Sequence, residues 1–231
     1  QQDITANPDD LYTAYLAPGS ISAPIPRQGQ AAQSTQAIIT DYIKNGFIHI
    51  VPKGLDHILF VLGLFFYAAR WQPLLGQVTL FTLAHSLTLF LASTGYIVVS
   101  PTVIEPMIAA SIIYIAYENI RGQRMNAIRI LVIFVFGLLH GLGFASVLSD
   151  IMIGDSMLNA GGFASSQFIL SLISFNIGVE LGQLAVLAPA FLLFGVIANN
   201  ALWYRKLIAL PASYLIGATG TWMLFTRVLS G

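Results

Sequence analysis

The sequence predicts an all-α fold, a polytopic membrane helix bundle of about six transmembrane helices. Composition is the first reason: 56% of the 231 residues are hydrophobic and only 9% are charged, whereas an ordinary soluble domain has about 25% charged residues. The mean hydropathy is +0.77. The second reason is that several apolar segments reach the roughly 20 residues that an α-helix needs to cross a bilayer.

These apolar segments predict six spans and one polar N-terminal region. The spans run at about 55–70, 74–99, 103–120, 128–149, 166–198 and 206–227. The fifth is long for one straight span, so we expect it to tilt or kink. Residues 1–45 are polar and contain several prolines, which predicts an extracytoplasmic N-terminal segment before a transmembrane domain over 46–231. Because the chain starts at Gln1, we expect that a secretory signal has been removed.

The basic residues of the short loops predict the orientation of the spans. Alternate loops contain Lys and Arg, whereas residues 93–102 and 150–166 contain none. Short loops rich in Lys and Arg stay in the cytoplasm. The chain is therefore expected to cross the membrane six times with both termini outside, and Arg227 near the C-terminus is the single basic residue against this orientation. The residues expected on the cytoplasmic side are Arg70, Arg121, Arg124, Arg129, Arg205 and Lys206.

Pairs of glycines four residues apart predict close helix contacts. Gly137 and Gly141 form one pair, and Gly178 and Gly182 form another. Small residues at this spacing let two helix backbones approach each other inside a lipid bilayer. The fourth and fifth spans are therefore expected to lie in the interior of the bundle.

Composition also excludes several classes of function. The formal net charge is zero and no long Lys/Arg cluster is present, so no nucleic acid is expected as a partner. The chain has no cysteine, which excludes disulfides, thiolate metal sites and cysteine nucleophiles. No phosphate-binding glycine loop or ATPase signature appears, so we expect no nucleotide hydrolysis within this chain.

Ionisable residues inside the apolar segments carry the functional prediction. An ionisable side chain in the bilayer costs at least about 2.5–3.5 kcal/mol, so it normally faces the bundle interior and has a partner. On the second span, Thr82 and His85 share a helix face, and on the fifth span Asn176, Glu180 and Gln183 share another. We expect these groups to line one cavity that opens outward. The residues concerned are His49, Asp56, His57, His85, His140 and Glu180.

This set of imidazoles and carboxylates suits a divalent transition metal: nickel, cobalt, zinc, copper or iron. All six residues are candidate metal ligands, and a shared proton-handling centre is the alternative. Asp56 is also a candidate partner for the second nitrogen of a metal-bound histidine. Adjacent helical positions diverge by about 100°, so Asp56 and His57 reach one site together only if the backbone bends, as Pro52 and Gly54 allow.

A packing role is the competing interpretation for each histidine alone, and His49 in particular is expected near the water boundary. Glu105 and Glu118 lie at opposite ends of the third span, where carboxylates reach water. For these two acids we expect a structural or capping role.

Five segments together resemble the HupE/UreJ-type membrane proteins, named for hydrogenase and urease accessory loci. In chain order they are "GFIHIVPKGLDHILFVLGLFF", "PLLGQVTLFTLAHSLTLFLA", "VIEPMIAASIIYIAYENI", "FGLLHGLGFASVL" and "FNIGVELGQLAVL". The resemblance runs from Gly46 to the end of the chain, and the chain looks like the second branch of the family. By this resemblance His49, Asp56 and His57 correspond to the family's first-span motif, and His140 to its histidine-glycine motif. The other histidine and the glutamate that nickel permeases carry around the latter motif are absent here.

The resemblance implies a permease for nickel or cobalt in the bacterial cytoplasmic (inner) membrane. We therefore expect a transporter rather than an enzyme, with the lipid bilayer and a metal ion as its partners. Two alternatives stay open. One is an intramembrane metalloenzyme with an open metal position, and the other is a structural or assembly subunit that binds other membrane subunits or forms a homo-oligomer.

Overall fold

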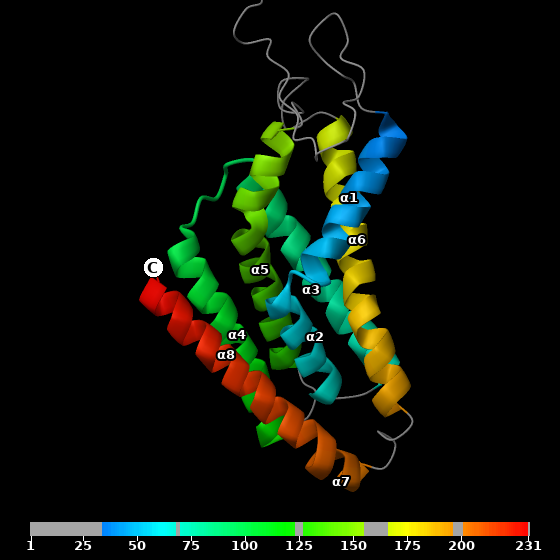
Figure 1. Cartoon of the computed structure of the whole chain (residues 1–231), viewed down its shortest axis with the longest axis vertical. Helices are drawn as coiled ribbons and strands as arrows, with labels where there is room; N and C mark the ends of the chain where they lie inside the picture. Colours follow the sequence, from blue (N-terminus) through cyan, green and yellow to red (C-terminus); the bar gives the residue numbers. More distant parts are fainter. Residues whose placement is uncertain (1–33, 68–69, 123–126, 155–165, 196–200, 231) are drawn as a thin grey trace, which may run out of the picture.

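The structure is a computed structural model that describes residues 34–67, 70–122, 127–154, 166–195 and 201–230 (Figure 1). Most of the described residues are helical and none of them is in a strand, which confirms the predicted all-α class. The helices in chain order are α1 (Thr35–Ile50), α2 (Leu55–Tyr67), α3 (Trp71–Ser93), α4 (Pro101–Arg121), α5 (Ala127–Gly154), α6 (Ser166–Ala190), the π-helical turn η3 (Phe191–Gly195), α7 (Ala201–Tyr204), the π-helical turn η5 (Arg205–Ala209) and α8 (Leu210–Ser230).

Five of the described helical stretches are long and apolar enough to cross a membrane, and the pair α1–α2 makes a sixth if it is one bent span. The chain is therefore a multi-pass membrane protein of about six spans, as its sequence predicts. The π-helical turn η3 follows Pro189, which removes a helix hydrogen bond and accounts for the change from α- to π-helix in the long fifth span.

The first span differs from its prediction as a single helix over 55–70. Helix α2 has 13 residues and is about 20 Å long, which is too short for the roughly 30 Å of hydrocarbon. Helix α1 precedes it, and the two are bent by 70° at Val51–Gly54. Polar residues such as Asp41 and Lys44 in α1 hide this helix from a search for apolar runs.

This helix also bears on the predicted domain boundary. The boundary between residues 45 and 46 falls inside α1, and residues 1–33 lie outside the described residues. The division into an N-terminal segment and a transmembrane domain therefore stays a prediction.

The helices pack as three pairs around α2, of which α1–α6 and α3–α5 are parallel and α4–α8 is antiparallel. Helix α1 lies along α6, α3 along α5, and α4 along α8, while α2 contacts members of all three pairs (Figure 1). Helices α1, α2, α4 and α6 run downward in this view, and α3, α5 and α8 run upward. The end of α8 lies at mid-height in this view, near the level of the start of α2.

The glycine pairs lie where helix backbones meet, as predicted. A Cβ atom on Gly178 would lie 2.9 Å from the Ile43 carbonyl carbon of α1, and one on Gly182 would lie 2.7 Å from Ile50 Cβ. A Cβ atom on Gly137 would lie 2.6 Å from the Phe81 carbonyl oxygen of α3, and one on Gly141 would clash with the same helix. These glycines fix the two closest helix pairs of the bundle.

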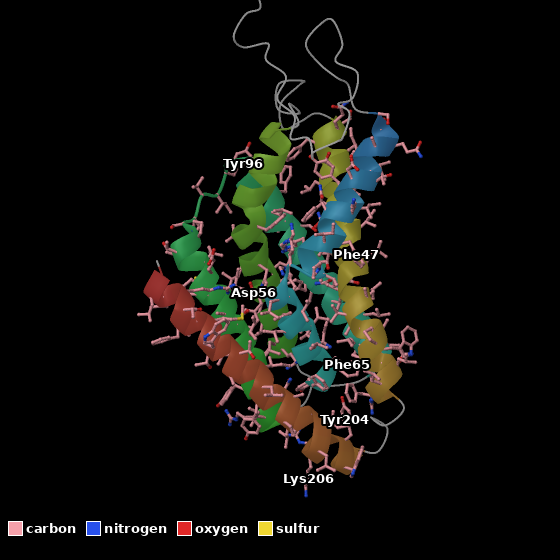
Figure 2. All side chains as sticks on the ribbon, in the orientation of Figure 1. Phe47, Asp56, Phe65, Tyr96, Tyr204 and Lys206 are labelled. Atoms are coloured by element: carbon pink, nitrogen blue, oxygen red, sulfur yellow. The ribbon has the colours of Figure 1, made fainter. Side chains whose placement is uncertain are left out.

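The helix ends that carry the described basic residues expected in the cytoplasm lie at one end of the bundle, the lower end in Figure 1. Lys206 marks this end in Figure 2. Arg129 differs from its prediction as a loop residue, because it is the third residue of α5 and its residue exposure is 1%. Arg124 lies outside the described residues. The orientation relative to the cytoplasm stays a prediction.

Candidate functional site: a histidine cluster between four helices

Four helices bring all four histidines of the chain together. His49 is in the last turn of α1, His57 in the first turn of α2, His85 in the middle of α3 and His140 in α5. The ring centre of His57 lies 4.8 Å from that of His49, 5.7 Å from that of His85 and 4.9 Å from that of His140. His57 is therefore the centre of the cluster.

The cluster is buried and its nitrogen atoms are poorly satisfied. His57, His85 and His140 are 5%, 0% and 1% exposed. Five imidazole nitrogens have no hydrogen-bond partner among the described residues: Nε2 of all four histidines and Nδ1 of His85. Leaving one buried polar atom unpaired costs about 1–3 kcal/mol, so a folded chain that keeps five together needs a compensating ligand or water.

One of these imidazoles has a defined tautomer. Nδ1 of His140 is 2.8 Å from the carbonyl oxygen of Phe136. A carbonyl oxygen only accepts, so Nδ1 donates the proton and the lone pair is on Nε2. A backbone carbonyl on the second nitrogen is the usual support of a metal-binding histidine.

The spacing of the rings suits a shared ion, although no ion site is formed in this conformation. Two imidazoles on one metal, with metal–nitrogen distances of about 2.1 Å, have ring centres roughly 4.5–5.5 Å apart. Two of the His57 distances fall in this range. Among the described residues, however, no three His, Asp or Glu side chains are arranged to hold a metal ion.

A pocket of about 330 Å³ reaches three of the four histidines. Its inner wall includes His49, His57 and His140, and its other walls come from the 51–54 link and from helices α4, α5 and α8. Charged residues line it as well. They are Lys53, Asp56, Glu105 and Arg227.

Asp56 lies in this pocket but does not bond a histidine. Nη2 of Arg227 donates to both of its carboxylate oxygens, at 3.1 and 2.8 Å. Figure 2 shows Asp56 near the middle of the bundle, at the start of α2. Its assignment as a metal ligand, or as the partner of one, stays a prediction.

Glu180 is not brought to the histidines. Its carboxylate accepts a hydrogen bond from the Thr79 hydroxyl at 2.6 Å, on the exposed face of α3. Thr79 and His85 are six residues apart, so they point about 120° apart around the helix. Gln183 faces the buried side of α3, where its amide oxygen accepts a hydrogen bond from the Thr82 hydroxyl at 2.9 Å. The polar face of α6 that contains Glu180 and Gln183 therefore borders α3 and does not line the pocket.

An aromatic layer separates the cluster from the other end of the bundle. The ring centre of Phe81 lies 5.0 Å from that of His140 and 4.8 Å from that of Phe60. Apolar residues such as Leu64 and Ile133 continue this layer. The pocket therefore has an apolar floor.

Below this floor lies a buried ion pair that sequence reasoning missed. Nη1 of Arg129 is 2.6 Å from the Glu118 carboxylate, and the two side chains are 1% and 9% exposed. The guanidinium carbon lies 3.5 Å from the Tyr67 ring centre, and Nε reaches Gln77 at 3.5 Å. Arg129 thus ties α2, α3, α4 and α5 together. The predicted structural role of Glu118 agrees with this contact. The position of Arg129 inside an apolar segment is the sequence feature that indicates a buried partner.

The profile of the family described as HupE / UreJ protein matches residues 26–227. It begins before Gly46, where the first resembling segment starts. Searches of curated proteins and of solved structures find no match. A match over most of the chain confirms the resemblance, and the chain belongs to the HupE / UreJ protein family.

Proposed function

We propose that this protein is a permease for a divalent transition-metal ion, nickel or cobalt, and that its four histidines bind the ion during passage. One observation carries the proposal: five unpartnered imidazole nitrogens from four helices meet beside a charged pocket. Neutral imidazole is a good ligand for both metals. The family's association with nickel and cobalt supply is in accord with this chemistry.

The layout supports passage from the pocket toward the basic end of the bundle. A hydrated ion enters beside Asp56 and exchanges waters for the imidazoles of His49, His57 and His140. His85 lies deeper, with its ring centre 5.7 Å from that of His57. The aromatic layer and the Arg129 ion pair block the way beyond, so release requires a rearrangement of the helices around them.

We place the protein in the bacterial inner membrane, with the pocket open to the outside and both termini extracytoplasmic. The basic residues at the opposite end of the bundle support this orientation, since such residues are retained in the cytoplasm. Uptake is therefore inward. Metal binding requires neutral imidazoles, so protons and metal compete for the cluster.

Uptake of radioactive nickel or cobalt into proteoliposomes tests the proposal. We expect His57→Ala to abolish saturable uptake, because His57 is at the centre of the cluster, and His140→Ala to reduce it strongly. Ser213→Ala is the matched control, since this buried hydroxyl bonds only the local Ala209 carbonyl in the contacts described, at 2.7 Å. Uptake that is unchanged in both histidine variants would refute the histidine route.

A metalloenzyme is the second candidate, and the closed floor of the pocket favours it. A chamber sealed by Phe60 and Phe81 would hold a metal and a small substrate without a path onward. Metal retained at one equivalent after purification, with no uptake into proteoliposomes, would support the enzyme instead of the permease.

A further inference from the structure

Arg227 joins three helices at the pocket. It is in the last turn of α8, and Nη2 donates to both carboxylate oxygens of Asp56 in α2, at 3.1 and 2.8 Å. Nη1 donates to the Glu105 carbonyl oxygen of α4 at 3.1 Å, and Nε lies 3.8 Å from the Glu105 carboxylate. One guanidinium therefore contacts both acids of the pocket.

This ion-pair group lies on the route to the histidines. Asp56, Glu105 and Arg227 line the same pocket as His57 and His140, and Asp56 directly precedes His57 in the chain. The Arg227 and Asp56 side chains are 20% and 22% exposed. An ion that reaches the imidazoles passes these partly hydrated charges first.

The charges of the pocket balance with Arg227 in place. Two carboxylates, Asp56 and Glu105, face two cations, Lys53 and Arg227. Guanidinium stays protonated under all ordinary conditions, so its charge is permanent. Without it the carboxylates would attract any cation. With it, an arriving cation must compete for Asp56 against a tethered positive group.

We propose that Arg227 is a specificity-determining residue: it occupies Asp56 as a built-in cation and gives up this carboxylate to an entering divalent ion. A divalent ion gains twice the Coulomb energy of a monovalent one at the same distance, so it displaces the guanidinium more readily. This inference rests on the proposed permease function. Asp56 then receives the ion one residue before His57.

Uptake kinetics give the first test. Removing one positive charge about 8 Å from a divalent ion, at a water-like dielectric, favours binding about fivefold. We therefore expect Arg227→Gln to lower the KM for nickel or cobalt about fivefold and to weaken the discrimination against sodium. Arg227→Lys keeps the charge, so it should keep the wild-type KM. Asp56→Asn combined with Arg227→Gln should cancel the gain.

A purely structural role of Arg227 predicts a different result. If Arg227 only holds α8 to α2 and α4, Arg227→Gln should lower Tm and Vmax without lowering KM. An unchanged or raised KM in Arg227→Gln would overturn the inference. Arg227→Lys keeps this test valid if Arg227→Gln folds poorly. Both variants lose the forked contact of the guanidinium group, so a purely structural role predicts a defect in both.

Thiol labelling measures the pocket charge without any metal. The chain has no cysteine, so Asn45→Cys, on the pocket wall, gives a single reactive thiol. The readout is the ratio of its rates with a cationic and an anionic methanethiosulfonate. At about 10 Å, loss of one positive charge should raise this ratio about fourfold at low salt. Tyr96→Cys, at an 80% exposed loop position away from Asp56 (Figure 2), is the control.

The two readouts separate this inference from the proposed function. Normal uptake in the histidine variants would refute the histidine route, and the labelling ratio would still report whether Arg227 sets the charge of the pocket. A ratio that is the same in wild type and Arg227→Gln would overturn the inference, whatever the uptake results are.

Discussion

Substitution of Gly178 by alanine gives a direct test of how α1 is held in the bundle. A Cβ at this position would lie 2.9 Å from both the Ile43 carbonyl carbon and the Phe47 nitrogen, and it would clash with the Ile43 carbonyl oxygen. These are backbone atoms of α1, so no side chain can turn away to make room. The two helices must separate by about 1 Å, and overpacking of this kind costs about 1–3 kcal/mol.

The effect should reach the histidine cluster. Gly46, three residues before His49, faces Phe175 and Val179 of α6 at the same crossing. A shift of α1 moves the His49 ring away from the centre of the cluster, where its ring centre is 4.8 Å from that of His57. We therefore expect the Gly178→Ala protein to lose metal affinity as well as stability.

Thermal unfolding of the purified protein measures the stability term. A loss of about 1–3 kcal/mol corresponds to a fall in Tm of roughly 2–12 °C for a chain of this size. Gly76→Ala is the matched control, since a Cβ there meets nothing within 4 Å, and alanine favours helix by up to about 1 kcal/mol. Equal Tm values and equal metal affinities for the two alanine variants would refute the predicted close approach of α1 to α6.

Three further predictions follow from the polar contacts. Glu118→Ala should cost about 3–5 kcal/mol of unfolding free energy, because it removes the carboxylate that balances the buried Arg129 charge; the double variant with Arg129→Met should recover part of this loss in thermal unfolding. Glu180→Gln should keep the metal affinity measured by calorimetry, because its carboxylate bonds Thr79 outside the pocket, and a large loss would return Glu180 to the ligand set. Uptake at fixed metal concentration should fall on acidification, because protons compete with the metal ion for neutral imidazole, and a rate that rises on acidification would contradict metal binding by neutral histidine.

The sequence predicts those features that depend on one helix at a time. Apolar length identified five of the spans, and small-residue spacing identified the close contacts at Gly137 and Gly178, because both depend on local sequence alone. The gathering of the histidines was also expected, since buried polar groups in lipid need interior positions. Their role as metal ligands stays a prediction.

The ion pairs could not be predicted, because they depend on which helices become neighbours. Arg227 and Asp56 are 171 residues apart, and nothing near either one identifies the other. Glu180 shows the same limit from the other side. Its position on a polar stripe suggested the pocket, yet the rotation of α6 against α3 directs it to Thr79. The sequence predicts which residues share a helix face, whereas only the packed structure shows which helix that face contacts.

The bend between α1 and α2 explains how neighbouring parts of the chain serve one cluster. His49 and His57 are eight residues apart, and on one straight helix they would be separated by about 12 Å along the axis. The 70° bend at Val51–Gly54 brings their ring centres to 4.8 Å. It also frees α2 to start in the middle of the bundle, where Asp56 meets Arg227 while His57 turns toward His140. A straight first span would place only one of these two histidines in the cluster, so the break in this helix is a requirement of the site.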